Sequence, residues 1–314
     1  MTSSLTQNRP VHLPTELMFL CLLALLWGSS FMLMKISLQE IPPVTLIAIR
    51  VSIATLFLFA IASYQRLSLP PRGKIWGALY IQGFLNSFGA WFLLAWGQQF
   101  VDTGLAGVLN STSPIFVCLI TLLFMRQVRL GGRKIAGAFL GLAGVVLIIG
   151  LDALAGLGEQ VLAQIAILSA AVLYGAAALY GQRFIHLSPT MTAAITSLWG
   201  LVTLVPLSLV IDRPWTLEYT ALPVLSAVCL GVLNTGVAML VYYRLIRTLG
   251  PVGVASQAYL RAGVSVILGV TLLGETLTLV IGTGLMIAVF GVVLINLPDR
   301  RKDRRPPPAS ESPE

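Results

Sequence analysis

The feature that most constrains this chain is a series of ten apolar runs, each roughly 18–25 residues long and bounded by charged residues or proline. A helix of that length crosses the hydrocarbon core of a bilayer. The runs predict ten spanning helices at residues 16–37, 43–64, 75–97, 103–125, 134–151, 161–182, 190–211, 220–246, 251–273 and 278–297. Apolar residues make up 57% of the chain and charged residues only 10%, which is too little polar surface for a soluble domain. We therefore expect an all-α integral membrane protein.

Lysine and arginine are distributed unevenly between the segments that connect these runs. Sixteen of the twenty lie on one side of the predicted membrane, whereas the loops on the other side carry Arg213 and seven acidic residues. Cytoplasmic loops of membrane proteins carry an excess of basic residues. We therefore expect a multi-pass protein of the bacterial inner membrane with both termini in the cytoplasm. The net charge of +8 is explained by this topology, and no nucleic-acid partner is expected.

The two halves of the chain share an ordered set of residues. The pentapeptide GVVLI occurs at 144–148 and again at 291–295, and the same offset of 147 or 148 residues relates Trp27 to Tyr174 and Asn86 to Asn234. Each half contains five predicted spans. Because five is odd, the second copy must enter the membrane from the opposite side, which predicts a 5+5 inverted repeat. Such repeats are common in alternating-access transporters.

These boundaries predict five segments along the chain. The two repeats are expected at 16–151 and 161–297, with a periplasmic linker at 152–160 between them. A cytoplasmic tail at 1–15 precedes the first repeat. Residues 298–314 are rich in basic residues and proline, which is typical of a disordered cytoplasmic tail.

Several short motifs resemble one known family. They are LLWGSSFMLMK in the first span, NSTSPIF in the fourth, LGE at 273–275, and the GVVLI that ends each half. In this order they are similar to the EamA family of the drug/metabolite transporter superfamily, over nearly the whole chain. The resemblance implies ten helices in an inverted repeat and small metabolites as substrates. The layout is also similar to that of the YddG-type amino-acid exporters.

One arginine is predicted to lie near the middle of the bilayer. Arg261 follows Pro251 by ten residues, which places it about 15 Å into the membrane. An arginine at that depth costs at least about 2.5–3.5 kcal/mol, so it should face a polar cavity or pair with backbone carbonyls. Other polar and aromatic residues at similar depth complete the candidate substrate-binding set: Trp27, Asn86, Asn110, Ser113, Tyr174, Asn234 and Tyr259.

We expect the helices that carry this set, the first, third, fourth, sixth, eighth and ninth, to surround a central cavity. The asparagines have an alternative role as hydrogen-bonding links between helices. Other aromatic residues, including Trp91 and Tyr242, are interpreted as packing or interfacial residues. Lys35 and Arg50 are expected near the ends of their helices, where long side chains can reach the membrane surface.

No Asp or Glu is expected in the middle of any span, which constrains the substrate. Exporters of cationic drugs need an acidic group within the membrane, whereas a central arginine suits a carboxylate. The sequence therefore predicts a zwitterionic or anionic small-molecule substrate. The chain contains no Walker loop, no HExxH motif and no paired central carboxylates, so no catalytic residue, cofactor or metal site is predicted. The remaining enzyme alternative is an integral-membrane enzyme that modifies lipids.

The predicted function is export of amino acids, with aromatic ones as one option, or of similar small metabolites by alternating access. The alternatives are a broad-range drug and metabolite exporter, and a structural or assembly protein that transports nothing. The lipid bilayer is the expected surrounding, and the expected assembly is a monomer or a weak homodimer.

Overall fold

The computed structural model of this protein describes residues 12–101, 103–125, 130–149, 159–261, 263–264 and 279–297. These residues form helices and no strand, and eight of the helical spans among them are long and apolar enough to cross a membrane. The predicted all-α membrane fold is confirmed. Most of the predicted tails at 1–15 and 298–314, most of the linker at 152–160, and the end of the ninth span lie outside the described residues.

The first half comprises the helices up to α7. They are α1 (Leu13–Ser37), α2 (Pro43–Tyr64), α3 (Lys74–Gly83), the π-helical turn η1 (Phe84–Phe88), α4 (Gly89–Gly97), α5 (Thr103–Asn110), α6 (Ser113–Phe124) and α7 (Gly132–Ile149). The segments α3, η1 and α4 form one continuous span, as do α5 and α6. Each boundary lies within one helical turn of the sequence prediction.

The second half repeats this pattern. It consists of α8 (Val161–Tyr180), the short helix η3 (Gly181–Phe184), α9 (Pro189–Ile211), η4 (Pro214–Thr216), α10 (Ala221–Gly231), the π-helical turn η5 (Val232–Val237), α11 (Ala238–Thr248), α12 (Gly250–Ala255) and α14 (Leu279–Asn296). The segments α10, η5 and α11 form one span. Helical residues continue after α12 to position 264, with residue 262 outside the description.

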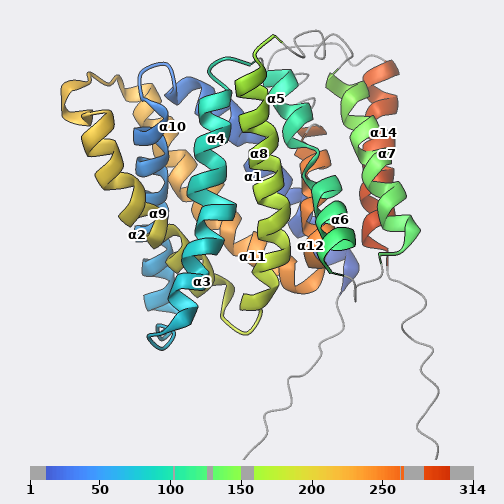
Figure 1. Ribbon diagram of the computed structural model, residues 1–314, viewed down its shortest axis with the longest axis horizontal. Helices are drawn as coiled ribbons and strands as arrows, with labels where there is room; N and C mark the ends of the chain where they lie inside the picture. The colour runs from blue at the N-terminus through green and yellow to red at the C-terminus, as the bar shows by residue number, and fades with distance from the viewer. Residues whose placement is uncertain are drawn as a thin grey trace, which may run out of the picture.

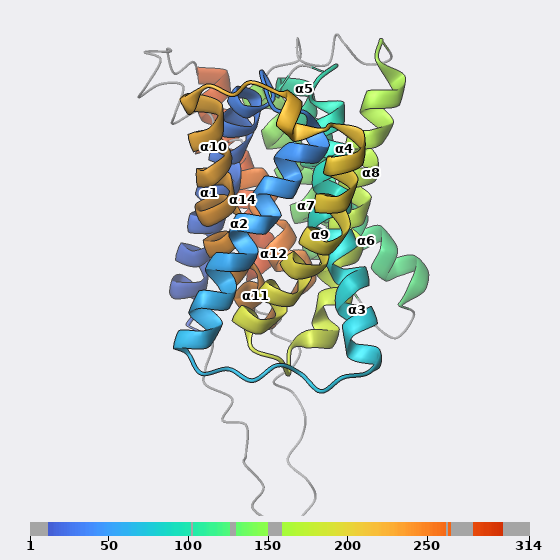
Figure 2. The ribbon, with the colours of Figure 1, turned by 90° about the vertical axis from the view of Figure 1, so that its left-hand side faces the viewer.

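Corresponding helices of the two halves run in opposite directions. The span α3–α4 rises through the bundle in Figure 1, whereas its equivalent α10–α11 descends, and Figure 2 shows the same opposition from the side. Likewise α1 begins at the lower end of the bundle and α8 begins at the upper end. The predicted inverted repeat is therefore confirmed. Below, lower and upper refer to the ends of the bundle in Figure 1.

Two helices of each half pack directly against their own equivalents. The contacting pairs are α2 with α9 and α7 with α14. In the second pair, a Cβ atom on Gly144 would lie 2.7 Å from the Gly284 carbonyl oxygen, and one on Gly291 would lie 2.7 Å from that of Gly137. Only glycine allows helix backbones to approach this closely. The repeated GVVLI thus marks the contact between the last helices of the two halves.

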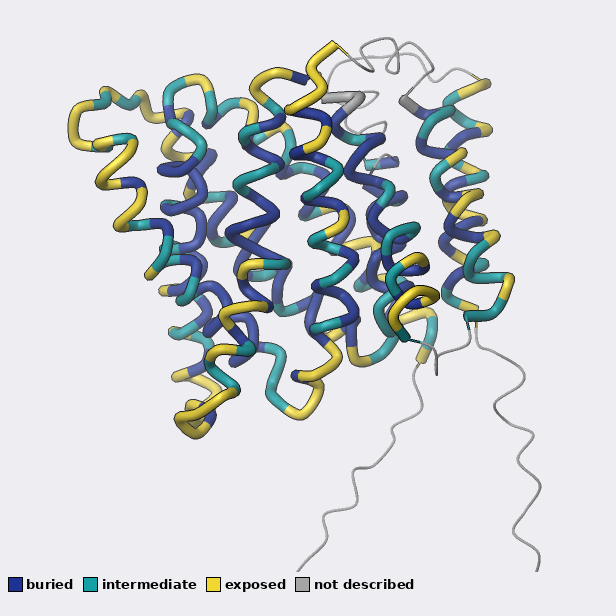
Figure 3. Tube along the Cα trace, in the orientation of Figure 1, coloured by how far each residue is buried: buried dark blue, intermediate teal, exposed yellow. Residues whose placement is uncertain are grey.

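The outside of the bundle is apolar and the inside contains polar groups. Exposed side chains include Met18, Leu56, Phe124 and Val210, each more than 70% exposed, as expected where lipid replaces water. In Figure 3 the buried residues follow the inner sides of the helices. Gln82, Asn110 and Thr235 are fully buried there. The polar interior places the candidate site between the two halves.

Candidate substrate-binding cavity

A cavity lies inside the bundle between the two halves. Its walls come from α1, α2, η1, α4, α6, α8, α11 and the helical stretch from α12 to Arg261. The lining residues are Trp27, Ser30, Phe31, Met34, Arg50, Asn86, Trp91, Leu94, Ser113, Tyr174, Ala178, Tyr242, Val254, Ala255, Gln257 and Arg261. The volume free for water-sized molecules is about 30 Å³, enough for about two waters but too small for an amino acid.

The structure brings five of the eight predicted site residues together in this lining. They are Trp27, Asn86, Ser113, Tyr174 and Arg261. Asn110 is not part of the lining but contacts Arg261, which is. Asn234 and Tyr259 do not belong to the lining.

Arg261 lies one and a half turns beyond α12 and is only 8% exposed. Its guanidinium carbon lies 5.6 Å from the centre of the Phe31 ring. Asn110, with its amide assigned so that the oxygen faces the guanidinium, accepts hydrogen bonds from Nη1 and Nη2 of Arg261 at 3.1 and 3.3 Å. The arginine is thereby oriented within the cavity wall.

Arg50 is a second arginine in the cavity, and the prediction that its side chain reaches toward the membrane surface is wrong. It lies about 10 Å from the start of α2, and its side chain turns inward and is 2% exposed. Its Nε donates to the Thr235 hydroxyl at 2.6 Å, and Nη2 donates to the Asn234 carbonyl at 3.2 Å. The guanidinium also stacks 4.0 Å above the Trp91 ring, a favourable cation–π contact. The second helix therefore joins the six that were predicted to surround the cavity.

The two equivalent asparagines have different surroundings. Asn234 donates from Nδ2 to the Ser29 hydroxyl at 3.0 Å and to the Leu26 carbonyl, so it connects η5 to α1. The position equivalent to Ser29 in the second half is Ala176, which has no hydroxyl to offer Asn86. Asn86 instead faces the cavity, where its Nδ2 lies 3.3 Å from the Met239 sulfur.

Tyr259 packs away from the cavity. It is fully buried, and its hydroxyl donates to the Ala138 carbonyl on α7 at 2.7 Å. Its ring lies directly against Gly141, where any larger residue would clash. These contacts are those of a structural residue that connects the stretch after α12 to α7.

Trp91 and Tyr242 line the cavity although the sequence suggested packing roles for them. In an ordinary α-helix, the residues that share a face with Asn86 lie three or four positions later. The π-helical turn η1 adds a residue to that turn, which brings position 91 to the cavity face. The sequence signal that could have predicted the position of Trp91 is a polar pair within each π-helical turn, Asn-Ser in the first half and Asn-Thr in the second.

The described lining contains two arginines and no Asp or Glu. Tyr174 lines the cavity together with both arginines. The cavity is therefore a positively charged site with aromatic walls, suited to an anionic group on a partly apolar solute.

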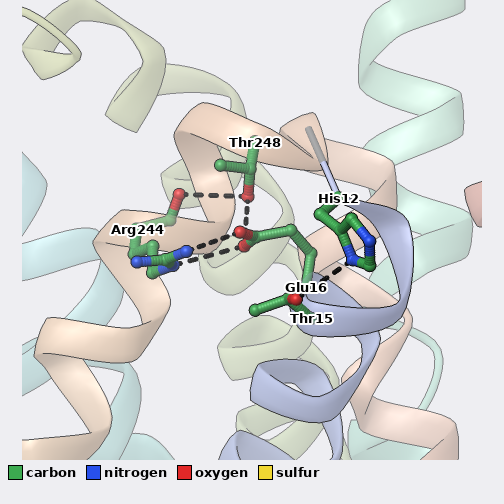
Figure 4. Close-up of polar contacts among 5 residues, drawn as sticks. All are labelled: His12, Thr15, Glu16, Arg244 and Thr248. Atoms are coloured by element: carbon green, nitrogen blue, oxygen red, sulfur yellow. Dashed lines mark hydrogen bonds and ion pairs between the residues drawn. The ribbon is translucent and has the colours of Figure 1, made fainter. Parts of the chain in front are cut away.

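Acidic residues instead take part in contacts at the ends of the bundle. At the lower end, Arg244 of α11 forms an ion pair of 2.7 Å with Glu16 of α1, and the Thr248 hydroxyl donates to the same carboxylate at 2.9 Å (Figure 4). At the upper end, Glu40 accepts hydrogen bonds from the backbone and the hydroxyl of Thr220, at 2.7 and 2.8 Å. The first contact joins α1 to α11, and the second joins the turn after α1 to the residue before α10, so the two lie at opposite ends of this pair of spans.

A wider recess lies at the upper end, between the ends of α1 and α4. It has a volume of about 470 Å³ and is lined by Lys35, Leu38, Gln39, Gln98, Gln99, Phe100 and Val101. These positions follow directly after Met34 and Leu94, which line the cavity. The recess therefore lies beyond Met34 and Leu94 along α1 and α4, toward the upper end.

Comparisons with known proteins agree with this architecture. The EamA-like transporter family matches the chain twice, at residues 14–150 and 161–297. The Escherichia coli K12 protein named uncharacterized inner membrane transporter YedA is 30% identical over 281 residues, 88% of each chain. The Bacillus subtilis protein named uncharacterized transporter YoaV is 29% identical over 220 residues, 70% of this chain and 75% of the relative.

A solved crystal structure shares the fold. It superposes with a TM-score of 0.76 at 19% sequence identity, and the match covers 92% of this chain and 99% of the other. The repeated family match covers both halves of the inverted repeat that the helices form. This chain is a membrane transporter that belongs to the EamA-like family of the drug/metabolite transporter superfamily.

Proposed function

We propose that this transporter exports amino acids, or small metabolites of similar size that carry a carboxylate, across the bacterial inner membrane. The observation that carries the proposal is Arg261, buried in a cavity between the two halves and oriented by Asn110. A guanidinium offers two parallel donors that match the two oxygens of a carboxylate. The rings of Trp27, Trp91 and Tyr174 would pack against the rest of the solute, which makes aromatic amino acids reasonable candidates.

Export would proceed by alternating access. The cavity, at about 30 Å³, cannot hold an amino acid unless its helices move apart. The recess at the upper end lies between α1, which packs against α10–α11, and α4, which packs against α8. Relative movement of these two helix pairs would open the cavity toward one end and then the other.

The alternatives fit the cavity less well. An exporter of permanent cations would have to place them beside Arg50 and Arg261, with no described carboxylate in the lining. A purely structural role does not explain why two arginines line a cavity, since burying a charge is costly. The proposal includes no catalytic step.

The proposal is tested with purified protein in proteoliposomes. Exchange of radiolabelled amino acids and organic anions is expected, with little uptake of quaternary ammonium dyes. Uptake of such a dye at the rate of the best amino acid would contradict the proposal and favour a broad drug exporter.

We also propose that the lower end of the bundle faces the cytoplasm. It carries the connections rich in Lys and Arg, and the relative YedA is named as an inner membrane protein. In a variant without Cys21, Cys118 and Cys229, a single cysteine at Gly131 should resist an impermeant thiol reagent added to intact cells. A cysteine at Trp215, which is 67% exposed near the upper end, is the matched control and should react. The reverse pattern would invert the proposed topology.

A further inference from the structure

Among the described residues, the cavity lining contains two buried arginines, one from each half of the protein. Arg50 comes from α2 and Arg261 from the stretch after α12. The positions are not equivalent in the repeat. The residue equivalent to Arg50 is Ser197, and the one equivalent to Arg261 is Ser113. Each arginine is therefore an addition to a symmetric scaffold and not a consequence of the duplication.

The contacts of Arg50 leave its charge without an anionic partner in the structure described. Its hydrogen-bond acceptors, the Thr235 hydroxyl and the Asn234 carbonyl, are both neutral. Nη1 has no hydrogen-bond partner among the described residues, and Arg50 lines the cavity. The remaining contact, with the Trp91 ring, is also to a neutral group. A buried cation without an anionic partner is costly, and this one lines the space that the solute would occupy.

Arg261 adds a second positive charge to the same small space. The two guanidinium groups repel each other across a medium that screens charge less than water does. A solute with one carboxylate and one ammonium would offset only one of the two charges, and its ammonium would lie close to the other. A solute with two anionic groups would offset both.

Resting on the proposed export function, we propose that the preferred solutes carry two anionic groups and a net negative charge, as acidic amino acids and short dicarboxylates do. One anionic group binds Arg261 beside Asn110, and the other binds Nη1 of Arg50. Lys35 in the upper recess places a further positive charge along the route of such a solute.

The test compares solutes of equal shape and different charge. Binding to the purified protein is measured by calorimetry for L-glutamate against L-glutamine, and for L-aspartate against L-asparagine. We expect each acid to bind at least tenfold more tightly than its amide, and uptake into proteoliposomes to follow the same order. Equal or tighter binding of the amides would overturn the proposed preference for two anionic groups. If the amides are also transported, the wider proposal of amino-acid export would still hold.

Substitutions then test whether Arg50 causes the preference for acid over amide. In Arg50→Ser, which copies the equivalent residue of the other half, the preference for acid over amide should fall below threefold. Arg50→Lys should retain part of it. Ser197→Ala is the matched control, because Ser197 is as deeply buried and does not line the cavity. A folded Arg50→Ser protein with an unchanged preference would overturn the assignment of that preference to Arg50. Uptake of cationic dyes in place of both acids and amides would overturn the proposed export of amino acids and similar metabolites as well.

Discussion

The two halves of this transporter share their helices and differ in their charges. Both have a π-helical turn in the third span with an asparagine at the same place, and both end in a helix that packs through glycine against its counterpart. The arginines of the cavity have serine as their equivalents. The symmetric elements therefore build the scaffold, and under the proposed function the asymmetric residues determine what the cavity binds.

The same contrast exists where the first span of each half packs against the third span of the other. At the lower end, α1 is held to α11 by the ion pair of Glu16 and Arg244. The equivalent positions in the pair of α8 and α4 are Ala163 and Trp96. There the helices approach through Gly97, where a Cβ atom would lie 3.0 Å from the Ala163 carbonyl oxygen. At these equivalent positions, one pair of helices is joined by an ion pair and the other by close packing.

The largest expected effect is the loss of Arg261, the charge that the second half contributes. Arg261→Ala should abolish measurable transport, because losing one partner of a buried charged contact costs about 2–5 kcal/mol, which is about thirtyfold to a few thousandfold in affinity. Arg261→Lys should restore part of the activity, since lysine keeps the charge and loses the planar fork.

The measurement combines uptake into proteoliposomes with size-exclusion profiles of the same purified proteins. A monodisperse Arg261→Ala protein that binds its substrate with unchanged affinity would remove this residue from the site. An Arg261→Ala protein that aggregates would instead indicate a structural role, so Arg261→Lys carries the decision in that case.

The sequence predicted the scaffold better than the site, and particular residues explain why. The offset of 147 or 148 residues gave the inverted repeat because helix length and apolar composition are read directly along the chain. The same offset predicted equal roles for Asn86 and Asn234. Asn234, however, bonds to Ser29, whereas the equivalent neighbour of Asn86 is Ala176, which has no hydroxyl. Equivalence in a repeat therefore predicts position and not contacts.

The predictions for two other residues depended on the direction of their side chains, which hydrophobic periodicity alone does not determine. Depth along the helix is compatible with Arg50 reaching the surface, but only the rotation of α2 decides that it points inward. Trp91 reaches the cavity face because η1 shifts the helical period, and a regular α-helix would not place it there.

The second prediction tests the closely packed pair of helices. Gly97→Leu places in α4 the residue that α11 has at the equivalent position, Leu245. The new side chain would meet Ile167 and the Ala163 carbonyl, and overpacking of this kind costs about 1–3 kcal/mol. We expect a lower melting temperature and slower transport, measured on purified protein. Gly77→Leu is the control, since no atom of the described residues lies within 4 Å of a Cβ atom there. Equal effects of the two substitutions would contradict the comparison.

The third prediction concerns the pair held by charge. A double-mutant cycle with Glu16→Gln and Arg244→Gln should give a coupling free energy of about 1 kcal/mol, because the Arg244 side chain is 46% exposed and water screens the attraction. The coupling should weaken at high salt, whereas the destabilisation by Gly97→Leu should not. Thermal unfolding at two salt concentrations measures both. A coupling independent of salt would show that shape, and not charge, holds α1 against α11.

The smallest expected effect comes from restoring symmetry around the asparagines. Ala176→Ser introduces in α8 the hydroxyl that Ser29 provides in α1, where it accepts from Asn234 at 3.0 Å. A hydrogen bond between membrane helices contributes about 0.6 kcal/mol, so the protein should become slightly more stable, and Ser29→Ala should weaken it by a similar amount. If Asn86 contacts the solute, its new bond to residue 176 should lower substrate affinity a few-fold, whereas Ser29→Ala should leave affinity unchanged. Calorimetric binding of the two variants compares these outcomes directly. If the Ala176→Ser protein is more stable but binds its substrate with unchanged affinity, Asn86 has a structural role, as Asn234 does in the other half.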